Sequence, residues 1–141
     1  MTDEEVQVSA LLKGKNLRIT PTRISILELF NQHQHALAHS DLETLTDQNF
    51  DRVTIYRTLK TFVDHGILHE VIDDEMKIKY SLCSNDCTSE AHHDNHLHFK
   101  CEKCERTYCL TSTQFPQFDI PKNYRAHTVQ VLISGLCEYC V

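Results

Sequence analysis

The sequence of 141 residues lacks the features of a secreted or membrane-spanning protein. It has no secretory signal and no apolar run of the length that a transmembrane helix needs. The cysteine count is odd, at seven, which is unlike a chain whose cysteines are all paired in disulfides. We therefore expect a cytoplasmic protein with reduced thiols, in which clustered cysteines indicate metal binding before disulfides.

The N-terminal part of the chain, up to Leu82, lacks cysteine altogether. A chain of this length fits one ordinary domain or two small ones. Lobes of about 70 residues bury so little apolar surface that each would need a metal, a disulfide or oligomerisation to stabilise it. All seven cysteines lie between Cys83 and Cys140, together with five of the ten histidines. The second half is therefore where a stabilising metal is expected.

The chain also lacks the excess positive charge that is typical of proteins binding nucleic acid, since its net charge is −6. Two stretches are nevertheless basic and free of acids, residues 13–23 (KGKNLRITPTR) and residues 52–60 (RVTIYRTLK). The acids gather elsewhere, at residues 3–5 and 73–75. This distribution predicts weak non-specific affinity for DNA and binding that needs a further factor.

Apolar residues at helical spacing predict four helices before Gly66. We expect them at residues 4–14, from Pro21 with Thr20 as cap, from His39 with Ser40 as cap, and from Asp51, as cap, to Gly66. The apolar stripe expected on the fourth helix comprises Val53, Ile55, Tyr56, Leu59, Phe62 and Val63.

Two β-prone runs follow, at residues 67–73 and 77–82, and the acidic turn between them indicates a hairpin. Helices followed by a hairpin predict a winged helix-turn-helix, whose last helix would enter the major groove of DNA. The alternative is a small helical core whose polar face meets only water. Beyond a polar linker, strands are expected at residues 96–101, 106–111 and 124–137, with a broken helix or turn region at residues 112–121.

Two C-x-x-C pairs, Cys101 with Cys104 and Cys137 with Cys140, lie far apart in the sequence, with residues 105–136 between them. Each pair lies at the end of an expected strand, where a tight turn can direct two thiolates at one tetrahedral Zn²⁺. Redox dithiols or unrelated cysteines are the alternatives. A closed four-thiolate site has no open position, so it would stabilise the fold rather than catalyse a reaction.

Other soft ligands lie near these pairs. His96 and His98 are two residues apart, which places both on one face of a strand. The remaining candidates that could converge on that face are Cys109 on the next strand, Cys83 at the end of the hairpin and His69 on its first strand. The alternative is that the histidines are exposed in a polar loop, as we expect for His92 and His93.

The motifs LRITPTR, TIYRTL, HLHFKCEKC and GLCEYC follow one another over nearly the whole chain. In this order they resemble the ferric uptake regulator (Fur) superfamily. The resemblance implies an α+β protein, with a winged-helix DNA-binding domain over residues 1–82, a hinge over 83–95, and an α/β dimerisation domain over 96–141 that holds a structural zinc on the four cysteines. It implies a transcriptional repressor that serves metal homeostasis. Such a repressor would be active as a metal-loaded homodimer on palindromic double-stranded operator DNA. No enzyme activity, small-molecule substrate or membrane is expected.

The resemblance also implies which residues contact DNA. Tyr56 and Arg57 match recognition-helix positions that contact bases and backbone, and Arg18 matches a basic residue that reaches the minor groove. An aromatic ring can pack on a thymine methyl, and a guanidinium suits guanine or phosphate. Thr54 is expected on the same helix face, and Arg23 and Lys60 are expected to contact phosphates.

The regulatory site departs from the iron-sensing pattern of the family. Ser81 takes the place of a glutamate before the hinge, Leu97 lies between two histidines where an acid is usual, and Cys109 replaces a carboxylate. Softer ligands shift the preference from Fe²⁺ and Mn²⁺ towards Zn²⁺. The resemblance is therefore closest to the zinc-sensing (Zur) branch, and the expected regulatory ligands are His69, Cys83, His96 and His98, with Cys109 as a competing ligand.

Three alternatives stay open. One is an iron- or peroxide-responsive regulator of the same superfamily, with Fe²⁺ or Mn²⁺ in the regulatory site. A second is a zinc enzyme with an open His/Cys site, although the sequence shows no H-x-E pairing and no plausible general base. The third is an interaction module that is stapled by zinc and has no role on DNA.

Overall fold

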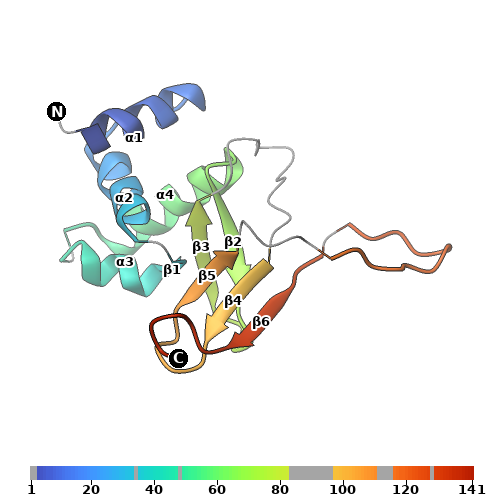
Figure 1. Cartoon of the computed structure of the whole chain (residues 1–141). Helices are drawn as coiled ribbons and strands as arrows, with labels where there is room; N and C mark the ends of the chain where they lie inside the picture. The colour runs from blue at the N-terminus through green and yellow to red at the C-terminus, as the bar shows by residue number, and fades with distance from the viewer. Residues whose placement is uncertain (1–2, 34, 48, 83–96, 111–115, 128) are drawn as a thin grey trace. The chain divides into compact units, whose positions relative to one another are not determined.

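The computed structural model describes residues 3–33, 35–47, 49–82, 97–110, 116–127 and 129–141 (Figure 1). The chain divides into two compact units, residues 1–94 and residues 95–141, and each is described by itself. The expected hinge, residues 83–95, lies outside the described residues.

The first unit contains the predicted helices and hairpin. Its elements are α1 (Asp3–Gly14), α2 (Pro21–Gln32), β1 (Leu37–Ala38), α3 (His39–Leu45), α4 (Arg52–Asp64), β2 (Leu68–Ile72) and β3 (Ile78–Leu82). The hairpin pairs β2 with β3 antiparallel, with Leu68 opposite Leu82. Strand β1, which the sequence did not predict, pairs with the other edge of β3 and places Leu37 opposite Tyr80. Two residues are too few to show the alternation that marks a strand.

Two of the predicted helix caps are confirmed and one is wrong. The Thr20 hydroxyl accepts a hydrogen bond from the Arg23 N–H at 3.2 Å, at the start of α2. The Asp51 carboxylate accepts the Thr54 N–H at 2.6 Å, at the start of α4. Ser40 is not the cap of α3, because the helix begins at His39 as expected, which makes Ala38 the cap position, and the Asp41 carboxylate reaches back to accept the Ala38 N–H at 2.8 Å.

The cap of α4 makes its stability depend on pH. Hydrogen bonds from the Thr54 hydroxyl and N–H hold the pKa of Asp51 below its usual value of 3.8. A lowered pKa in the folded state means that the charged carboxylate stabilises the helix at neutral pH and that this contribution is lost as pH falls below about 4. We expect Asp51→Asn, which keeps a capping oxygen, to lose less of its melting temperature between pH 5 and pH 3 than the wild type, as followed by circular dichroism. Equal losses in both proteins would contradict this role.

The core of the first unit lies between the helices and the base of the hairpin. Its fully buried side chains include Leu12, Ile26, Leu27, Leu42, Ile55, Leu59, Phe62 and Leu68. On α4 the predicted stripe is correct for Ile55, Leu59 and Phe62 but wrong for Val53 and Tyr56, whose side chains are 54% and 57% exposed. These two residues lie on the outer face of the helix, so their apolar character is not explained by the core.

The second unit is built on β4 (Leu97–Cys101), β5 (Thr107–Leu110) and β6 (Leu132–Gly135). Strand β4 is central, antiparallel to β5 and parallel to β6. The strand predicted over residues 124–137 is wrong in length, because within the described residues only 132–135 have a partner strand. No helix is present in the described part of the predicted turn region, residues 116–121.

Candidate metal centre and nucleic-acid interface

Four cysteine side chains converge at one end of the sheet of the second unit. The sulfur atoms of Cys101, Cys104, Cys137 and Cys140 all lie within 4.8 Å of one another. The Sγ atoms of Cys104 and Cys137 are 3.9 Å apart. Sulfurs placed tetrahedrally about 2.3 Å from a zinc ion would be about 3.8 Å apart, so this geometry fits one four-thiolate Zn²⁺ site.

Strand pairing explains why residues so distant in the sequence meet here. Strands β4 and β6 run parallel with Cys101 opposite Gly135, so the turns that follow them begin at the same end of the sheet. The Glu102 N–H donates to the Gly135 carbonyl at 2.7 Å, which fixes the two chains where the cysteine turns start. In the first turn Glu105 adopts a left-handed conformation with φ of 65°, and its N–H donates to the Cys101 carbonyl at 3.0 Å.

The electrostatics of the four thiols favour a bound cation. The backbone N–H groups of Cys104 and Cys137 point at the Cys101 sulfur, 3.5 Å away in each case, and they lower the pKa of Cys101 to about 6. Hydrogen bonding to the Cys137 sulfur, and then burial, raise the pKa of Cys140 to about 12. The four adjacent thiols therefore cannot all lose their protons unaided. A divalent cation such as Zn²⁺ would balance the negative charge of the four thiolates.

The expected regulatory ligands are only partly within the described residues. His98 on β4 lies directly opposite Cys109 on β5. His69 lies on β2 of the first unit, opposite Ser81. Cys83 and His96 fall outside the described residues. The same holds for the linker residues Cys87, His92 and His93.

The residues expected to contact DNA lie on the accessible side of the first unit. Tyr56, Arg57 and Lys60 are exposed on α4, and Thr54 is half-buried at its start. Arg18 is exposed in the loop before α2. Spacings of three, four and seven residues from Val53 place Tyr56, Arg57 and Lys60 on one helix face. One surface of α4 therefore combines aromatic, aliphatic and basic side chains.

Arg23 has a structural task in the same region. Its guanidinium donates a hydrogen bond to the Arg18 carbonyl at 2.7 Å. This contact holds the loop that carries Arg18 against the first turn of α2. The expected phosphate contact of Arg23 stays a prediction, and the structure adds that the same side chain positions Arg18.

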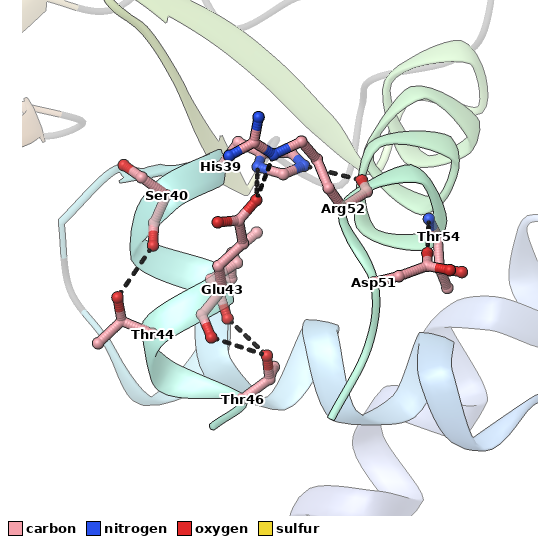
Figure 2. A network of polar contacts seen from close by, with 9 residues as sticks. His39, Ser40, Glu43, Thr44, Thr46, Asp51, Arg52 and Thr54 are labelled. Carbon is pink, nitrogen blue, oxygen red and sulfur yellow. Dashed lines mark hydrogen bonds and ion pairs between the residues drawn. The ribbon is translucent and has the colours of Figure 1, made fainter. Parts of the chain in front are cut away.

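A polar network joins α3 to the start of α4 (Figure 2). One Glu43 oxygen lies 3.0 Å from Arg52 Nε and 3.1 Å from His39 Nδ1. The opposite ring nitrogen of His39, Nε2, donates to the Arg52 carbonyl at 3.0 Å. This network was not predicted from the sequence, although His39 and Glu43 are four residues apart in the expected third helix and such pairs meet on a helix surface. The network fixes the position at which α4 begins.

The comparisons with known proteins agree with this fold. A family model described as "Ferric uptake regulator family" matches residues 14–133. The peroxide-responsive repressor PerR of Staphylococcus epidermidis is 28% identical, over 98% of this chain and 91% of that protein. The corresponding protein of Staphylococcus saprophyticus is 27% identical, over 92% and 86% of the two chains.

Solved structures resemble the chain over nearly its full length. A zinc uptake regulator complexed with zinc and DNA has a TM-score of 0.66 at 18% identity and covers 99% of this chain and 95% of that one. A zinc-bound manganese uptake regulator has a TM-score of 0.63 at 16% identity, over 92% and 98% of the chains. The Vibrio cholerae ferric uptake regulator has a TM-score of 0.60 at 19% identity, over 91% and 98%.

The family match confirms the α+β class, with a winged helix-turn-helix followed by a smaller dimerisation domain. Members of this family are transcriptional regulators and not enzymes, and they act on double-stranded DNA as homodimers. Among the described helices none is long and apolar enough to cross a membrane. The chain belongs to the ferric uptake regulator family of metal-responsive transcriptional repressors.

Proposed function

We propose that the protein is a cytoplasmic, zinc-responsive repressor that binds palindromic operator DNA as a homodimer when its regulatory site is loaded. The observation that carries the choice of metal is the pairing of His98 with Cys109 across β4 and β5. An imidazole and a thiol at this point give the site a soft donor set. Such ligands favour Zn²⁺ over Fe²⁺ and Mn²⁺, which prefer more oxygen donors.

We assign two metal sites to each chain. The four cysteines hold a structural zinc, and their closed geometry gives it no role in sensing. The regulatory ligands are His69, Cys83, His96 and His98, with Cys109 competing for the fourth position. In the sequence, His69 and Cys83 precede the linker while the other three follow it. Metal bound by ligands from both sides of the linker would restrict the hinge. The two recognition helices of a dimer would then meet major grooves at the spacing of the operator half-sites.

The surface of the second unit supports a homodimer. Large apolar side chains are exposed there, namely Phe118, Ile120, Tyr124, Val129, Ile133 and Leu136. In the described sheet β6 pairs only with β4, so its other edge offers unpaired backbone groups. A unit this small cannot cover these side chains itself, and a second copy of the chain is the partner that the family provides.

A peroxide-responsive repressor is the second candidate. Similarity to the staphylococcal PerR proteins over almost the whole chain favours it. In such a protein, Fe²⁺ would be held by histidine and carboxylate ligands, and peroxide reduced at that iron would oxidise a histidine ligand. Cys109 stands where the resemblance implies one of the carboxylates, which weakens this candidate. Histidine oxidation in the iron-loaded protein after peroxide, detected by mass spectrometry, would favour it over zinc sensing.

The test is DNA binding at fixed salt with Zn²⁺, Fe²⁺ and Mn²⁺ in parallel. The operator is first selected from a random duplex pool with the zinc-loaded protein. We expect Zn²⁺ to tighten binding by about 5- to 150-fold, the range of ordinary allosteric coupling, and Cys83→Ser to abolish this response. Cys87→Ser, which changes a linker thiol outside the proposed ligand set, is the matched control and should respond like the wild type. An unchanged affinity with Zn²⁺, or a full response in Cys83→Ser, would refute the proposal.

A further inference from the structure

Val53 is an exposed aliphatic side chain on the first turn of α4. Its side chain is 54% exposed. The Asp51 cap fixes the turn on which it lies, because the Asp51 carboxylate accepts the Thr54 N–H at 2.6 Å. Val53 is therefore held rigidly on the outer face of the helix, three residues before Tyr56.

A hollow of about 560 Å³ opens beside this turn, between α4 and the hairpin. Its lining residues are Val53, Tyr56, Ile78, Tyr80, His39, Arg52 and Arg57. Four of these are aliphatic or aromatic, and the other three are histidine or arginine. Such a lining suits a partner that presents a small apolar group next to negative charge.

The major groove of DNA presents that combination. The C5-methyl group of thymine is the apolar group on the base edges there, and phosphates flank it. In a helix-turn-helix protein, the residues at the start of the recognition helix contact base edges. Val53 occupies such a position, one helical turn before Tyr56 and on the same face.

We propose that Val53 is a specificity-determining residue, whose side chain packs on a thymine methyl in each operator half-site. The proposal rests on the proposed function, because it needs α4 to lie in the major groove. Arg57, which also lines the hollow, then faces the adjacent phosphates or a guanine.

The experiment removes the methyl group from the DNA and the side chain from the protein. In one half-site of the selected operator, each thymine in turn is replaced by deoxyuridine, which lacks only the C5-methyl group. Affinities are measured for the zinc-loaded wild type, for Val53→Ala, and for Val6→Ala as control. Val6 on α1 is 52% exposed, so the control removes the same atoms from an equally accessible site.

We expect one position at which deoxyuridine weakens wild-type binding about fourfold, the ratio that ~0.8 kcal/mol per buried methyl-sized group gives. At that position Val53→Ala should show no difference between the two bases, whereas Val6→Ala should keep the wild-type pattern. Penalties at thymines read by other residues should persist in all three proteins. An identical set of penalties in the wild type and Val53→Ala would overturn the proposal and leave the proposed function intact. No DNA binding by any zinc-loaded protein would overturn both.

Discussion

Replacement of Cys101 by serine should release one zinc per chain and unfold the second unit. Cys101 is fully buried and accepts two backbone N–H groups, so serine removes both a ligand and the atom that organises the two turns. The described part of this unit has few other buried apolar side chains, and structural zinc contributes about 10 kcal/mol or more to such small domains. We expect the free energy of unfolding to fall by on the order of 5 kcal/mol.

Zinc content by mass spectrometry and unfolding followed by circular dichroism measure this effect on the full chain. Cys109→Ser is the matched control, because Cys109 lies on β5 outside the cluster of four sulfurs. It should keep the structural zinc and, when that zinc alone is bound, the wild-type melting temperature. A Cys101→Ser protein that retains one tightly bound zinc and unfolds like the wild type would show that the cluster is not a structural site.

Arg57→Ala should weaken operator binding about 100-fold or more without changing the stability of the protein. Arg57 is exposed on α4, so its loss leaves the core intact. A good base or phosphate contact is worth about 1–3 kcal/mol, and a homodimer loses two of them. Fluorescence anisotropy with the selected operator at fixed salt measures the loss.

Arg125→Ala, which removes an exposed arginine from the second unit, is the control for the general effect of charge. It should bind within about twofold of the wild type, because charges outside the interface contribute little at physiological salt. Lys60→Ala should weaken binding to all sequences equally and reduce its salt dependence, as expected for a phosphate contact. Operator binding by Arg57→Ala at the wild-type affinity would remove α4 from the interface.

The sequence was sufficient wherever a local rule decides the structure. Caps such as Thr20 and Asp51 were predictable because a side chain meets the backbone two or three residues away. The cysteine cluster was predictable because spacing within each C-x-x-C pair restricts the turn to few geometries. The caps and the turn within each cysteine pair depend on neighbours in the chain, whereas the meeting of the two pairs depends on the pairing of β4 with β6.

The sequence was insufficient where the burial or the strand pairing of a residue depends on a distant part of the chain or on another molecule. Val53 and Tyr56 fit the apolar stripe of α4 as well as Ile55 does, yet they are exposed, because apolar character does not tell whether a side chain meets the core or another molecule. The alternation at residues 129–134 predicted one long strand over residues 124–137, but within the described residues only 132–135 pair with another strand. The expectation that Cys109 converges on the face of His98 is confirmed, but the register that sets the two directly opposite each other depends on the left-handed turn at Glu105, a conformation that glutamate rarely adopts.

The two-residue strand β1 has a mechanical consequence for signalling. It runs directly into α3 and is bonded to β3, while Glu43 and His39 bind α3 to the start of α4. The β2–β3 hairpin, α3 and α4 are thus joined by hydrogen bonds. We therefore expect the first unit to move as one rigid body. A displacement applied at His69 on β2 would be carried to Tyr56 as rotation of the whole lobe. Under the proposed function, metal at His69 would need only to set the orientation of this unit, and we expect the DNA-reading surface itself to be the same in the loaded and unloaded states.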